Sequence, residues 1–151
     1  GVLQFKQRTG NPEKFQGNFR LSASEAALTT EGPLGKKNGK TTFLASVRRS
    51  YLQLLFQLIE LPFLPDYWDY QYKITHKINN KNELNFLGVG SIDNFTFKRP
   101  DNPTLEQLAI LEQLPVNTQR TNTIGVSWRH TINNGFTLLS VSNNRLVNTA
   151  D

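Results

Sequence analysis

Few residues of this chain are of types that carry out chemistry. The sequence has no cysteine, which removes thiolate nucleophiles, thiolate metal sites and disulfides together. The two histidines, His76 and His130, lie far apart in sequence, each near a turn on the apolar side of an expected strand. No carboxylate spacing supports a metal site between them. We interpret both as interfacial side chains beside aromatic neighbours.

Two other patterns could be taken for active-site motifs. Residues 35–41 (Gly-Lys-Lys-Asn-Gly-Lys-Thr) come nearest to a phosphate-binding loop, but one residue is missing between the glycines and a strand-like sequence follows where a helix is needed. We interpret them as a basic hairpin turn. Asp66 and Asp69 could be imagined as paired catalytic acids, yet nothing in the sequence brings them together over a substrate. We therefore predict no catalytic, metal or cofactor-binding residues and no enzyme activity.

The most informative pattern is the alternation that runs from Trp68 to Ile78. Every second residue there is apolar or amphipathic, and the residues between them are polar. This predicts a strand with two different faces, longer than the usual strand of about five or six residues. Such a length is what a tilted strand needs to cross a bilayer, and the aromatic residues gather at one end as an interfacial girdle does.

The rest of the chain also reads as strands joined by turns. We expect strands at residues 2–8, 15–22, 26–34, 41–51, 83–97, 119–130 and 136–146, and short helices at 52–60 and 104–114. A three-residue turn at 80–82 would place Ile78 opposite Leu84 and His76 opposite Phe86. Gly88 and Gly90 suggest a bend or bulge in their strand.

The predicted connections fall into two kinds that alternate along the chain. Turns at 36–39, 80–82 and 132–135 are short, whereas the connections at 52–65 and 98–118 are long and carry the helices. In outer-membrane barrels the short turns are periplasmic and the long loops extracellular. The sorting of connections by length therefore favours a transmembrane β-barrel over a soluble sandwich.

Composition is compatible with this interpretation. The 37% hydrophobic content suits strands that present only alternate residues to lipid, and no apolar run of eighteen residues is present. The net charge of +5 comes from scattered residues without a recognisable binding module, so we do not expect a nucleic-acid partner. Because the chain has no methionine, we expect a processed or partial chain.

Five stretches resemble one family. They are residues 1–5, 28–34, 45–52, 61–65 and 81–93, and the most specific parts are Glu31-Gly32-Pro33 and Arg48-Arg49-Ser50-Tyr51. These stretches are similar to TonB-dependent outer-membrane receptors, particularly the nutrient-uptake branch with carboxypeptidase-like N-terminal extensions.

The resemblance implies a fold, a location and a set of partners. Residues 1–14 would be the end of a plug domain with its linker, and residues 15–151 the first part of an antiparallel transmembrane β-barrel, about seven strands of a larger one. The function would be energy-coupled nutrient uptake at the bacterial outer membrane. The partners would be outer-membrane lipid, the rest of the barrel and plug, and TonB through parts not present here. Whether a surface lid lipoprotein is a further partner is not decided by the resemblance.

Two other classes of protein remain as alternatives. The first is a soluble all-β binding module with a one-sided sheet. The second is a small complete outer-membrane barrel with an adhesive or structural role, against which the odd count of about seven strands argues. The sequence does not identify the transported substrate or the residues that contact it.

Overall fold

The computed structural model describes residues 7–37, 39–59, 63–97, 105 and 117–150. Within these ranges the chain forms seven strands and a short helix, in the order β1 (Gln16–Leu21), β2 (Glu25–Pro33), β3 (Thr41–Ser50), α1 (Leu52–Leu58), β4 (Phe63–Lys77), β5 (Asn82–Phe97), β6 (Asn117–Ile132) and β7 (Gly135–Ala150). Among the described residues, no helix is both long and apolar enough to cross a membrane.

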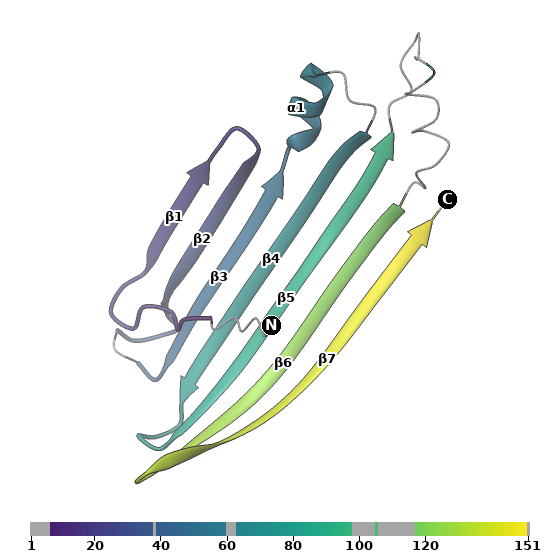
Figure 1. Ribbon diagram of the computed structural model, residues 1–151. Coiled ribbons are helices and arrows are strands. Elements are labelled where there is room, and N and C mark those ends of the chain that lie inside the picture. The colour runs from purple at the N-terminus through teal and green to yellow at the C-terminus, as the bar shows by residue number, and fades with distance from the viewer. Residues whose placement is uncertain (1–6, 38, 60–62, 98–104, 106–116, 151) are drawn as a thin grey trace.

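The strands make one antiparallel meander in which each strand pairs with the next along the chain (Figure 1). The all-β prediction and the count of seven strands are therefore confirmed. The sheet is open, with β1 and β7 at its two edges. Its strands lengthen from six residues in β1 to sixteen in β5, β6 and β7.

Several predicted boundaries need correction. Residues 7 and 8, assigned by the sequence to a first strand, are not in a strand, and the other residues of that prediction up to residue 6 lie outside the described ranges. β4 begins at Phe63 and takes in Pro65, which we had placed in the preceding loop. Of the second predicted helix, only Leu105 is described, and it is helical.

The turn between β4 and β5 is longer than predicted. Four residues, 78–81, connect the strands, and the Oδ1 atom of Asn79 accepts hydrogen bonds from the backbone N–H groups of Lys81 and Asn82. This side-chain cap organises a wider turn, and His76 pairs with Leu84 instead of Phe86. The predicted register was wrong by two residues, but an even shift leaves every side chain on its predicted face.

The pairing of β4 with β5 runs without interruption, so there is no bulge at Gly88 or Gly90, one of the two features suggested for these glycines. The two glycines lie opposite Tyr72 and Tyr70, respectively. A Cβ atom at Gly88 would lie 2.3 Å from the Cζ atom of Tyr72, and one at Gly90 would lie 2.4 Å from the Tyr70 hydroxyl. The glycines therefore provide room for tyrosine rings that cross to the neighbouring strand.

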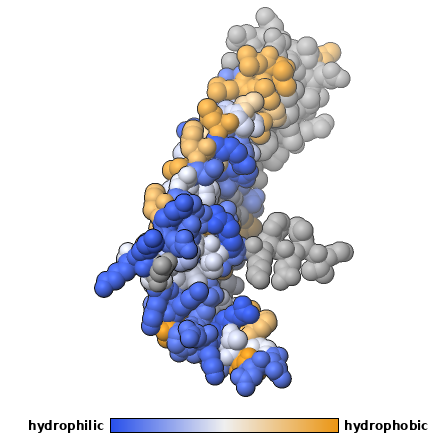
Figure 2. Space-filling view, turned by 90° about the vertical axis from the view of Figure 1, so that its left-hand side faces the viewer, coloured by the Kyte–Doolittle hydropathy of each residue, from blue (hydrophilic) through white to orange (hydrophobic). Residues whose placement is uncertain are grey.

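Across β2 to β4 the sheet has two faces of opposite character, whereas on β7 exposed Phe136, Leu138 and Leu146 also lie on the polar face. Large apolar side chains are mostly exposed, and Leu44 is the one buried large hydrophobic residue among those described. The other side chains with little exposure are polar or charged and lie on the same face as Leu44: Glu31, Thr42, Ser50, Thr75 and Asn85. Figure 2, which looks onto the β1 edge, shows hydrophilic residues across the centre and hydrophobic ones in the upper part.

Candidate functional site

One face of the sheet carries a continuous band of exposed apolar side chains, which we call the apolar band. Cross-strand partners share a face, so the pairing registers define its members. It contains a large apolar residue from every strand, including Phe19, Leu28, Val47, Trp68, Phe86, Val126 and Val141, each between 36% and 71% exposed. A contiguous apolar surface of this extent marks contact with a partner or a membrane.

The apolar band crosses the sheet obliquely. On β2 it consists of Ala26 and Leu28, which stand in register, through β3, with Trp68 and Tyr70 of β4. On β7 it consists of Leu139 and Val141, which stand in register, through β6 and β5, with His76 and Ile74. Between β2 and β7 the band shifts along the strand direction by about six residues, which is about 20 Å. The distance across the sheet between these two strands is five strand spacings, which is about 24 Å.

This displacement gives the angle between the strands and the band. A shift of about 20 Å along the strands for about 24 Å across them places the perpendicular to the band at about 40° to the strands. Strands of transmembrane barrels are tilted by about 35–45° from the membrane normal. The angle between the strands and the perpendicular to the band is therefore the angle that tilted barrel strands make with the membrane normal.

Polar and aromatic groups line both borders of the apolar band. Near the helix α1 end, the guanidinium of Arg49 lies 5.0 Å from the centre of the Trp68 ring and 3.7 Å from the Asp66 carboxylate. At the other end, Trp128 Nε1 donates a hydrogen bond of 3.2 Å to Asn82 Oδ1, and His130 Nδ1 lies 2.9 Å from the same oxygen. Arg49, which shares the face of Phe43 and Val47 on β3, thus lies at a border of the apolar band.

The opposite, polar face holds the segment that precedes β1. Arg8 makes two hydrogen bonds with the carboxylate of Glu31, one of them 2.8 Å long, and the backbone N–H of Asn11 donates to the same carboxylate at 3.1 Å. The Lys73 ammonium donates to the carbonyl oxygen of Gln7 at 3.0 Å. A Cβ atom at Gly10 would lie 1.9 Å from the carbonyl oxygen of Phe43, so only glycine fits there.

Glu31 is the centre of this docking contact. Its side chain is 11% exposed, whereas that of Arg8 is 62% exposed. The hydrogen bonds with Glu31 raise the pKa of Arg8 above its usual value. The sequence did not reveal this pair, because its members are separated by 23 positions and only the fold brings them together.

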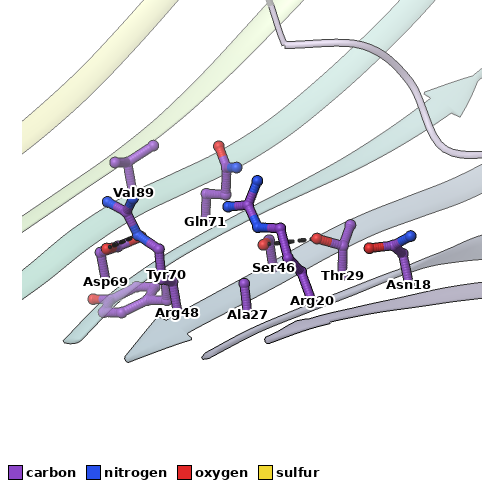
Figure 3. Close-up of a pocket in the computed structure, with 10 residues that line it drawn as sticks. All are labelled: Asn18, Arg20, Ala27, Thr29, Ser46, Arg48, Asp69, Tyr70, Gln71 and Val89. Carbon is purple, nitrogen blue, oxygen red and sulfur yellow. Dashed lines mark hydrogen bonds and ion pairs between the residues drawn. The ribbon is translucent and has the colours of Figure 1, made fainter. Parts of the chain in front are cut away.

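Beside the docked segment, the polar face is hollowed over β1 to β5 (Figure 3). The hollow has a volume of about 450 Å³ and is lined by Asn18, Arg20, Ala27, Thr29, Ser46, Arg48, Asp69, Tyr70, Gln71 and Val89. Arg48 bridges Asp69 at 2.7 Å and Glu25 at 3.2 Å, and Arg20 joins Glu25 at 2.8 Å. The hollow is therefore a polar wall whose charged groups are paired with one another.

The structure separates the groups that could have formed a chemical site. Asp66 and Asp69 lie on opposite faces of β4, as their spacing of three residues requires in a strand. His76 is bonded to the Thr41 hydroxyl at 2.8 Å, whereas His130 is beside Asn82 on another strand pair. After residues 35–40 the chain continues as β3 instead of a helix. No cluster of potential metal ligands occurs within the described ranges.

Comparison of the chain with protein-family models, with curated proteins and with solved structures found no match.

Proposed function

We propose that this chain is part of the transmembrane β-barrel of a TonB-dependent outer-membrane receptor that takes up nutrients. The observation that carries the proposal is the apolar band, which crosses all seven strands. The perpendicular to the band lies at about 40° to the strands, as the membrane normal does in a barrel of tilted strands. Its aromatic and polar borders match the two interfaces of a bilayer. The family assignment rests on the resemblance of the sequence stretches described above.

The open edges support a larger barrel. Among the described residues, β1 and β7 each have a single partner strand. In hydrocarbon, every unpaired backbone group costs several kcal/mol, so an open sheet is not stable there. We therefore propose that further strands complete the barrel, and that the polar face lines its interior.

The docked segment supports a plugged interior. Residues 7–11 bind the polar face through Arg8, Glu31 and Lys73, where a plug domain would enter the barrel. In such a receptor the substrate is captured at the extracellular loops and passes through the plugged interior under the control of TonB. No covalent chemistry is required of this chain.

Spin labels on neighbouring residues test the proposal directly. Leu139 and Ser140 are both exposed and lie on opposite faces of β7. In the full-length protein reconstituted in lipid, a label at residue 139 should be accessible to oxygen, and one at 140 to a water-soluble nickel reagent. Equal accessibility of the two labels to both reagents would contradict a lipid-facing band and favour a soluble binding module.

The proposed orientation has its own test. The end of the sheet that carries α1 and the long connections should be extracellular, and the end with the turns at 34–40, 78–81 and 133–134 should be periplasmic. A cysteine introduced at Gln57 in α1 should react with a membrane-impermeant reagent on whole cells, whereas one at Asn80 should react only after the outer membrane is broken. The reverse pattern would invert the orientation.

A further inference from the structure

Besides residues 22–24 between β1 and β2, which lie at the end of the sheet where α1 stands, the sheet has three short connections, and these gather at the opposite end (Figure 1). They are residues 34–40, 78–81 and 133–134, between β2 and β3, β4 and β5, and β6 and β7. Backbone hydrogen bonds hold them next to one another: Lys77 N–H donates to the Lys40 carbonyl at 2.8 Å, and Thr131 N–H donates to the Lys81 carbonyl at 2.7 Å. This end of the sheet, which we call the short-turn end, is therefore one continuous surface.

The short-turn end is strongly basic. Its turns and the adjoining strand ends carry six cationic side chains and a single acidic one, Glu83; the cations are Lys36, Lys37, Lys40, Lys77, Lys81 and Arg129. Among the described residues, no ion pair involves any of the six. At the other end of β1 to β4, by contrast, Arg20, Arg48 and Arg49 are all paired with carboxylates.

Of these cations, Lys81 stands directly beyond the border of the apolar band that faces the short-turn end. Trp128 and His130, whose rings lie 5.7 Å apart, mark that border on β6. A hollow of about 450 Å³ opens next to them and is lined by Lys81, His130, Thr131, Ile132, Asn133 and Asn134. It therefore combines an ammonium group, amides and an imidazole with the apolar side chain of Ile132.

We propose that the short-turn end binds the headgroups of anionic phospholipids, with one phosphate in the hollow beside Lys81. This inference rests on the proposed membrane location. An anionic phospholipid supplies the negative charge that these lysines lack as ion-pair partners, and its acyl chains would continue along the apolar band from Trp128 toward Val126. Basic side chains near an anionic membrane surface each contribute to such binding.

The test is a titration of lipids followed by native mass spectrometry of the full-length protein in neutral detergent. The probes are phosphatidylglycerol, phosphatidylcholine and inorganic phosphate. The double variant Lys36→Gln/Lys81→Gln removes two charges from the short-turn end. The matched control, Arg120→Gln/Arg145→Gln, removes two charges from the face of the apolar band, nearer the opposite end of β6 and β7.

We expect phosphatidylglycerol to bind more tightly than phosphatidylcholine. Its affinity should fall about fivefold for each lysine removed, hence about 25-fold in the double variant, and by less than twofold in the control. Equal binding of the two lipids, or equal losses in the two variants, would overturn the inference. Full competition by inorganic phosphate would also overturn it, because the ligand would then be free phosphate.

The same sample separates this inference from the proposed function. Insertion of the wild-type protein into nanodiscs of pure phosphatidylcholine tests the barrel alone. Failure to insert would count against the barrel, whereas insertion without a preference for phosphatidylglycerol would count only against the headgroup site.

Discussion

Val126 provides the sharpest test of the apolar band. It lies between Ile124 and Trp128 on β6 and is paired with Phe86 and Val141, all of them apolar. The first polar residues on its face of the strand are Asn122 and His130, each four positions away. Four residues span about 13 Å of strand, or about 10 Å of depth at a tilt of 40°. Val126 is therefore close to the centre of the band.

Replacement of Val126 by arginine should be costly. A charged side chain on the lipid face of a barrel costs about 2–4 kcal/mol at the midplane and about 0–1 kcal/mol near the interfaces. Because Val126 is about 10 Å from either border, we expect the upper range, about 2–4 kcal/mol. The control is Ser140→Arg, an exposed position on the polar face that pairs with Ser127, the next residue along β6. Its expected effect is within about 0.5 kcal/mol.

The assay is urea-induced unfolding of the full-length protein in phospholipid vesicles, followed by tryptophan fluorescence and by the heat-dependent mobility of folded barrels on gels. Both variants are measured in the same lipid, so that their free energies of unfolding can be compared. If Ser140→Arg costs as much as Val126→Arg, or if Val126→Arg costs less than about 1 kcal/mol, the assignment of the lipid-facing side is wrong.

Two further predictions concern contacts within the sheet. Gly88→Ala should destabilise the protein by about 1–3 kcal/mol, because the new methyl group meets the Tyr72 ring, whereas Gly125→Ala, whose Cβ atom would have no neighbour closer than 3.5 Å, should be tolerated. Equal melting temperatures for the two variants would contradict the packing of that ring on glycine. Glu31→Gln should weaken the docking of residues 7–11 by about 1–2 kcal/mol and speed their hydrogen exchange, whereas the same change at the exposed Glu13 should not. Unchanged exchange in Glu31→Gln would show that the ion pair does not hold the segment.

The faces of the strands could be predicted from the sequence because they depend on local alternation alone. Trp68, Tyr70, Tyr72 and Ile74 share one face with Phe43, as the period of two requires. This information survives errors in the position of a strand end, because adding residues at either end of β4 does not change which side chains point together.

The contacts between strands could not be predicted in the same way. The pairing of Tyr72 with Gly88 depends on the turn at 78–81, and the hydrophobic pattern does not detect a register shift of two residues. The alternating tyrosines and glycines were visible in the sequence, but their meaning required the register. The pair of Arg8 and Glu31 required in addition the path of the segment before β1.

The distribution of burial favours the proposed barrel over its main alternative. A soluble one-sided sheet buries its apolar face and exposes its polar face to water. In this sheet the residues with least exposure, among them Glu31, Leu44 and Thr75, lie on the polar face, and the apolar face is open. Covering the apolar face with a protein partner would require a surface that spans all seven strands and follows the oblique course of the band. A bilayer would meet both conditions without any specific complementarity. The apolar layer of a bilayer crosses the tilted strands of a barrel at the same angle as the apolar band crosses the strands of this sheet.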